Sequence, residues 1–175
     1  MPKRMESAEL QIHPLHVVDC AVIAQAYSDL GGEKLLEQTM RYLEEQQAGK
    51  RAVLVAWLGQ DFAGYLTILW ESAHPPLRKE GVPEILDLNV LPAFRRLGIA
   101  TALLEEAEGL IAQRKDAVGV GMPMTADSTA AQRLFSQRGY LLEGSGLYSH
   151  GYPVKQGEQV PVDDELRLYF VRDIT

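Results

Sequence analysis

The hydrophobic positions along the chain follow two periods, one typical of amphipathic helices and one typical of strands. In the first helical stretch, Val18, Ala21 and Val22 recur at helical spacing. The strand-like runs are apolar and are punctuated by glycine or proline. The pattern predicts helices over residues 16–30, 34–48, 99–115 and 129–138, and strands over residues 9–14, 51–58, 62–70, 84–90, 117–122, 140–142 and 165–172.

The most regular helical pattern is that of residues 99–115. Its apolar stripe comprises Ile99, Leu103, Ala107, Leu110 and Ile111. Its acidic residues, which we expect to face water, are Glu105, Glu106 and Glu108. Residues 71–83 and 146–163 are punctuated by glycine and proline and are expected to form loops.

Two β-rich runs flank Gly59-Gln60-Asp61 and predict an antiparallel hairpin. Further along the chain the order becomes strand, helix, strand. Hairpins followed by strand-helix-strand units indicate a mixed, mostly antiparallel sheet flanked by helices, an α/β fold. We expect residues 1–175 to form a single domain, since their number is close to the usual size of one.

The composition is that of an ordinary globular protein, with 46% hydrophobic residues. This excludes a disordered tail, a collagen-like fibre and a disulfide scaffold. Seventeen Lys and Arg against 24 Asp and Glu give a net charge of −7, which argues against nucleic acid as a partner and fits a cationic substrate.

The single cysteine, Cys20, cannot form an internal disulfide, and a free thiol suits a reducing compartment. The four histidines show no ligand spacing, so no metal is expected. The N-terminal residues do not resemble a secretory signal, and no stretch approaches the ~18 apolar residues of a membrane span. We therefore expect a cytoplasmic protein without a membrane partner.

The stretch from Glu84 to Thr101 carries the candidate chemistry. A strand leads into a turn with Arg95, Arg96 and Gly98 and then directly into the most regular helix. Helix N-termini present unpaired N–H groups and a partial positive charge, which favours phosphate binding. The Walker A and dinucleotide glycine patterns are absent. The loop therefore fits a pyrophosphate, although a plain helix start with two solvated arginines has the same local pattern.

Two segments place this loop in a wider context. Leu-Asn-Val-Leu-Pro-Ala-Phe-Arg-Arg-Leu-Gly-Ile-Ala-Thr (88–101) resembles the acyl-CoA-binding motif of the GNAT superfamily of N-acetyltransferases. Ser-Thr-Ala-Ala-Gln-Arg-Leu-Phe-Ser-Gln-Arg-Gly-Tyr (128–140) resembles the next element of that family. Both motifs occur in the family's order and spacing, and together they imply a GNAT-like fold that uses acetyl-CoA.

The resemblance also implies roles for individual residues. The strand should carry a bulge and splay from strand 117–122, which would admit the acceptor amine, and a backbone N–H near Asn89 or Val90 should polarise the thioester carbonyl. The residues expected to contact coenzyme A are Leu88, Asn89 and Val90 along the pantetheine arm, Arg95, Arg96, Leu97, Gly98, Ile99, Ala100 and Thr101 around the pyrophosphate, and Phe135.

An aliphatic amine has a pKa of ~10.4, so removing its proton at pH 7 costs about 4–5 kcal/mol and calls for a general base. Glu84 is the first candidate for this base, followed by Asp87 and Asp127. Phe135 stands where the family often has the tyrosine that protonates the leaving thiolate. Tyr140, Tyr148 and Tyr152 are the candidate substitutes, and Tyr148 and Tyr152 lie in the polar segment 146–163.

These residues predict transfer of an acetyl group to a primary amine, with a small molecule as the expected acceptor. Two alternatives stay open: acetylation of a protein lysine or N-terminus, and a non-catalytic acyl-CoA-binding module, for which Phe135 is the best argument. The identity of the acceptor, the length of the acyl group and the choice between a monomer and a homodimer are also open.

Overall fold

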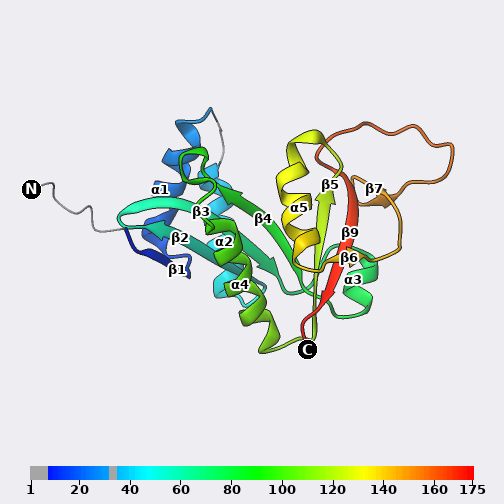
Figure 1. Cartoon of the computed structure of the whole chain (residues 1–175), viewed down its shortest axis with the longest axis horizontal. Helices are drawn as coiled ribbons and strands as arrows, with labels where there is room; N and C mark the ends of the chain where they lie inside the picture. Colours follow the sequence, from blue (N-terminus) through cyan, green and yellow to red (C-terminus); the bar gives the residue numbers. More distant parts are fainter. Residues whose placement is uncertain (1–7, 32–34) are drawn as a thin grey trace, which may run out of the picture. The chain divides into compact units, whose positions relative to one another are not determined.

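The computed structural model describes residues 8–31 and 35–175 (Figure 1). The chain divides into two compact units. The first takes the chain up to Thr67 together with Asp87–Glu106, and the second comprises Ile68–Leu86 together with Ala107–Thr175. Strand β4 (Glu84–Val90) and helix α4 (Ile99–Ala112) contribute residues to both units. The single domain over 1–175 stays a prediction.

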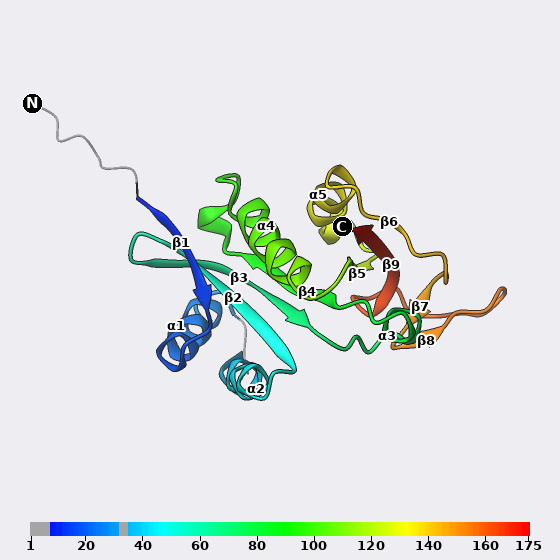
Figure 2. The ribbon, with the colours of Figure 1, turned by 90° about the horizontal axis from the view of Figure 1, so that it is seen from below.

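The first unit contains a sheet in the order β1-β2-β3-β4. Strand β1 (Leu10–Pro14) pairs antiparallel with β2 (Arg51–Leu58), and β3 (Asp61–Leu69) follows β2 after a tight turn. Helices α1 (Val17–Ser28) and α2 (Leu35–Gln47) lie on one face of these strands, and the start of α4 lies on the other face (Figure 2). The predicted start of the second helix at Lys34 falls outside the described residues.

The core of the first unit lies between α1, α2 and the strands. Its buried members are Leu15, Cys20, Ile23, Leu43, Val53, Val55, Phe62 and Tyr65. The stripe that marked α1 in the sequence is not its buried face, because Val18 is 71% exposed and Val22 is 41% exposed. Helix α1 is apolar around most of its circumference, so periodicity alone could not select the side that meets the sheet.

The second unit is built around β5 (Ala117–Pro123) and β9 (Leu166–Asp173), which pair antiparallel along their whole length. The first residues of β4 join β5 in parallel, at Glu84–Gly119 and Ile85–Val120. Short strands β6 (Leu141–Leu142) and β7 (Tyr148–Ser149) also pair with β9, and β8 (Tyr152–Pro153) pairs with β7. Helix α5 (Thr129–Gln137) follows the 3-10 turn η2 (Ala126–Ser128).

Two segments that were expected to be loops contain regular structure. Residues 75–79 form the short helix α3 (Pro75–Lys79), because two prolines at its first positions have the φ that a helix start needs. Leu77 of α3 packs on β5, where a Cβ on Gly119 would lie 2.6 Å from Leu77 Cδ1. The segment 146–163 contains the small β7–β8 hairpin.

Glu108 on α4 is the main correction to the predicted surface, since it is buried rather than facing water. Its carboxylate accepts hydrogen bonds from Arg138 Nη2 at 2.7 Å, Arg172 Nη1 at 2.5 Å and Tyr140 Oη at 3.0 Å. Burial alone would raise the pKa of Glu108, but the hydrogen bonds and charges of these partners outweigh it and hold the pKa below its usual value. The buried charge is therefore paired in the folded state.

A mixed sheet, mostly antiparallel and flanked by helices, confirms the predicted fold class. In the part of the chain that the structure describes, no helix has the length and apolarity needed to cross a bilayer.

Candidate functional site

The turn between β4 and α4 is shaped to expose backbone amides. After the 3-10 turn η1 (Pro92–Phe94), Arg96 and Gly98 adopt left-handed φ angles of 63° and 79°. The first hydrogen bond of α4 runs from the Ala102 N–H to the Gly98 carbonyl at 3.0 Å. The N–H groups of Ile99, Ala100 and Thr101 precede that bond, so the helix offers them no acceptor.

The charges around this turn favour an anion. Arg95 and Arg96 are exposed, and the first turn of α4 carries no acidic side chain. The buried side chain of Ile99, 2% exposed, fixes the start of the helix on the core. A helix N-terminus with two adjacent guanidinium groups can hold a phosphate or diphosphate by charge-assisted hydrogen bonds.

Strand β4 is kinked at Asp87, which has a left-handed φ of 55°. Beyond the kink, the Asn89 carbonyl faces β3, since a Cβ on Gly64 would lie 2.4 Å from that oxygen. The Leu91 N–H also bonds to β3, at the Ala63 carbonyl, 2.8 Å away.

Successive residues of a strand direct their N–H and C=O groups to opposite sides. Leu88 and Val90 therefore direct these groups away from β3, where an extended ligand can pair with them. Asn89 and Val90 are the two expected oxyanion donors. The Asn89 backbone faces β3, so the Val90 N–H is the remaining candidate. The Val90 carbonyl accepts a hydrogen bond from Arg95 Nε at 3.2 Å, which ties the arginine to the end of the strand.

Asp87 is exposed and lies among tyrosines. Tyr42 Oη on α2 donates to Asp87 Oδ2 at 2.5 Å. The Asn89 amide donates to Tyr65 Oη at 3.5 Å. Tyr27 on α1 lies edge-on to the Tyr65 ring, with centroids 6.1 Å apart. The left-handed conformation at Asp87, which Asp tolerates better than most residues, gives this carboxylate its place beside three phenols.

The three tyrosines stay neutral at physiological pH. Burial is the main cause that raises the pKa of Tyr27 to about 12, with the Arg95 charge lowering it and the Asp87 charge raising it. Burial and the Asp87 charge also raise the pKa values of Tyr42 and Tyr65 above the ordinary tyrosine value. The Tyr27 hydroxyl is buried and has no hydrogen-bond partner among the described residues.

Three predicted site residues belong to the second unit. Glu84 is only 3% exposed and accepts a hydrogen bond from Ser72 Oγ at 3.3 Å. Tyr148 packs edge-on against the His74 ring, with centroids 4.4 Å apart. Phe135 is buried against the Tyr140 ring at 4.9 Å. All three side chains lie in packed surroundings, unlike the exposed Asp87.

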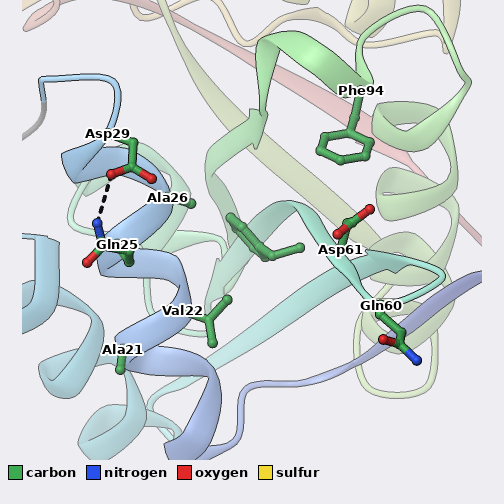
Figure 3. Close-up of a pocket in the computed structure, with 9 residues that line it drawn as sticks. Ala21, Val22, Gln25, Ala26, Asp29, Gln60, Asp61 and Phe94 are labelled. Carbon is green, nitrogen blue, oxygen red and sulfur yellow. Dashed lines mark hydrogen bonds between the residues drawn. The ribbon is translucent and has the colours of Figure 1, made fainter.

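An open hollow of about 540 Å³ lies in the first unit. Figure 3 shows the side chains that line it. Helix α1 and the β2–β3 turn form its walls, and Gln25 Nε2 donates to Asp29 Oδ1 at 2.8 Å on its rim. Phe94, which directly precedes Arg95, closes one side. None of the site residues predicted from the sequence lines this hollow.

His13, His16 and Asp19 place one ligand atom each within 4.8 Å of one another, a grouping that the sequence reading did not find. The Asp19 carboxylate already has a structural role there, because Oδ2 accepts the His16 backbone N–H at 2.7 Å at the start of α1.

The sequence reading also missed the tyrosines around Asp87. Tyr42 and Asp87 are 45 positions apart and belong to different elements, so no local pattern joins them. A signal was present only in part: Tyr65 and Asn89 interrupt strands that are otherwise largely apolar.

A kinked strand that leads into a helix start with unpaired amides and two arginines, on a mixed sheet, is typical of folds that bind a nucleotide or a coenzyme. The chain belongs to the acetyltransferase (GNAT) family, whose model matches residues 20–140. This membership supports acyl-CoA-dependent acetyl transfer. A search of curated proteins found no match.

Solved structures with the same fold cover almost the whole chain. An N-acetyltransferase from Staphylococcus aureus Mu50 has 16% identity and a TM-score of 0.70, over 96% of this chain and 100% of that one. A Salmonella typhimurium protein named as an acetyltransferase, solved with its cofactor acetyl-CoA, has 19% identity and a TM-score of 0.66, over 95% of this chain and 94% of that one. An acetyltransferase from the same organism that modifies the N-terminal serine of ribosomal protein L7/L12 has 15% identity and a TM-score of 0.70, over 95% of both chains.

Proposed function

We propose that the protein transfers the acetyl group of acetyl-CoA to a primary amine of a small molecule. The observation that carries this proposal is the start of α4, where free amides follow Gly98 and two exposed arginines, with no acidic side chain in the first turn. Family membership supports the donor, and the chemistry of Asp87 supports an amine acceptor.

In this proposal the loop holds the diphosphate of the coenzyme. The contacting residues are Arg95, Arg96, Leu97, Gly98, Ile99, Ala100 and Thr101. The backbone of Leu88 and Val90, directed away from β3, pairs with the pantetheine arm, and the Val90 N–H stabilises the developing oxyanion. Phe135 belongs to the second unit, and its contact with the coenzyme stays a prediction.

Asp87 is the proposed general base. It takes a proton from the bound ammonium, and the freed nitrogen forms a C–N bond with the thioester carbonyl carbon. The nitrogen then gives its second proton to water as the C–S bond breaks, and the coenzyme A thiolate leaves and takes a proton from water. Thiols have a pKa of about 8.5, so this leaving group does not require a protein acid, which is consistent with Phe135 in the tyrosine position. Asp87 is preferred to Glu84 because Glu84 is buried.

Free thiol release from acetyl-CoA, with and without a panel of small primary amines, tests this function. We expect amine-dependent thiol release and an N-acetylated product of matching mass. Propionyl-CoA and butyryl-CoA as donors determine the acyl length. Peptides with a free N-terminus or an internal lysine form the macromolecular arm. Binding of acetyl-CoA without amine-dependent release in either arm would support the non-catalytic module and contradict the proposal.

A further inference from the structure

Asp87 is exposed, yet its carboxylate is held by a neighbouring side chain, which a solvated surface carboxylate does not require. Tyr42 donates to its Oδ2 at 2.5 Å, while the residue itself is exposed. A left-handed backbone angle is unfavourable for most residues other than glycine. The fold therefore keeps this side chain in a fixed place, with one oxygen hydrogen-bonded, at a cost in stability.

Tyr42 is itself held in place by a second layer. The Arg51 guanidinium lies over the Tyr42 ring, 4.2 Å from its centroid. Arg51 Nε donates to Glu45 Oε2 at 2.5 Å, and Nη1 donates to Thr67 Oγ1 at 2.9 Å. Because Arg51 is 9% exposed, this network fixes the ring before any ligand arrives. A preorganised donor is typical of binding sites, since little side-chain freedom is then lost on binding.

We propose that Asp87 and the tyrosines around it are the acceptor site, and that the site takes a primary ammonium on an uncharged alkyl chain. This inference rests on the proposed function. Asp87 makes the ionic contact through the carboxylate oxygen that Tyr42 leaves open. Tyr42 is a positioning residue, and Asn89 offers a neutral amide beside the site.

The charge balance of the site sets this ligand class. The groups that face Asp87 are Tyr42 from α2, Tyr65 from β3 and Tyr27 from α1, and all three phenols are neutral. Two cations lie nearby: Arg95 donates to the Val90 carbonyl, and Arg51 is paired with Glu45. Asp87 thus presents one negative charge to a ligand, and the net charge of −7 adds a long-range preference for cations.

Two five-carbon acceptors test the class: n-pentylamine and norvaline, which carries a carboxylate beside its amine. 2-Aminopentane, with a methyl group in place of that carboxylate, controls for the branched carbon that bears the amine. We expect kcat/KM for n-pentylamine to exceed that for norvaline at least ~10-fold, because like charges a few ångströms apart repel by several kcal/mol at a protein surface. The lower amine pKa of norvaline acts in the opposite direction, so it cannot produce this preference.

Variants then locate the site. Asp87→Asn keeps a residue that tolerates left-handed φ, and we expect it to lower kcat/KM for n-pentylamine about 100-fold, within the range of general-base effects. Tyr42→Phe should lower kcat about 10-fold with the KM for acetyl-CoA unchanged. Tyr169→Phe, at a half-buried tyrosine of β9 in the second unit, is the matched control.

Circular dichroism and acetyl-CoA affinity establish that each variant is folded. If both variants acetylate n-pentylamine like the wild type, the acceptor site and the role of Asp87 as general base are wrong, while acetyl transfer to a small amine stands. If the wild type transfers acetyl to other amines but never to n-pentylamine, the ligand class is wrong. If no amine releases thiol, the proposed function itself fails.

Discussion

Replacing Gly98 by alanine tests the anion-binding turn directly. Gly98 has a φ of 79°, and a Cβ built there meets no atom within 4 Å. The methyl group therefore causes no clash in the free protein, but it occupies the open face of the turn. Gly157→Ala is a matched control, because Gly157 has a φ of 85° and equally open surroundings in the second unit.

Two effects with different magnitudes follow from this substitution. An alanine in the left-handed region costs about 1–2 kcal/mol, so Gly98→Ala and Gly157→Ala should lower the free energy of unfolding by similar amounts. At Gly98 the methyl also displaces a diphosphate oxygen from the helix amides. Losing one charge-assisted hydrogen bond costs about 1.5–3 kcal/mol, which corresponds to a roughly 10- to 100-fold higher Kd for acetyl-CoA.

Isothermal titration calorimetry with acetyl-CoA and urea unfolding of the same samples separate the two effects. We expect both variants to unfold at lower urea concentration, and the Kd to rise only in Gly98→Ala. A folded Gly98→Ala protein with wild-type affinity would refute the placement of the diphosphate at this turn. Equal loss of affinity in both variants would trace the effect to general destabilisation.

Two further substitutions test the packing that supports the site. Gly64→Ala places a Cβ 2.4 Å from the Asn89 carbonyl oxygen, so β3 and β4 must separate; we expect an unfolding free energy lower by about 2 kcal/mol and weaker acetyl-CoA binding, measured by urea unfolding and calorimetry. Glu108→Gln removes the buried charge to which Arg138, Arg172 and Tyr140 donate, and it should lower the free energy of unfolding by about 3 kcal/mol at pH 7. The folded-state pKa of Glu108 lies below its unfolded value, so this contribution is present above the unfolded pKa and is lost as pH falls through the folded pKa. Urea midpoints of wild type and variant should therefore converge on acidification.

One control substitution and two contradicting outcomes belong to these predictions. Gly109→Ala lies in open space within α4 and should stabilise the protein by about 0.5–1 kcal/mol without changing acetyl-CoA affinity. A Gly64→Ala protein as stable as the wild type would contradict the close approach of β3 and β4. A stability difference at Glu108 that stays constant from pH 7 to pH 3 would contradict the ion-pair account.

The order of elements could be predicted from the sequence because each is long or clearly punctuated. The strands around Gly59 and the helix from Ile99 follow from period and turn residues. The buried face of α1 could not be predicted, because apolar residues occupy most of the circumference of this helix and no single face stands out. Glu108 was misplaced because its partners Arg138 and Arg172 lie 30 and 64 positions away, and such ion pairs leave no local trace.

The candidate site could likewise be predicted only where it depends on residues that are close in the sequence. The turn proposed to bind the diphosphate depends on consecutive residues, so its pattern is visible from Arg95 to Thr101. The surroundings of Asp87 depend on a backbone kink and on Tyr42 from another helix, and neither has a sequence signal. Glu84 ranked first as a base from its place at a strand start, but burial beside Ser72 gives it packed surroundings instead.

A crystal structure of the protein with coenzyme A tests the central claim most directly. The account predicts diphosphate oxygens about 2.7–3.2 Å from the amide nitrogens at Gly98, Ile99 and Ala100, the range of N–H···O hydrogen bonds. Coenzyme A bound elsewhere, with this turn occupied only by solvent, would contradict it.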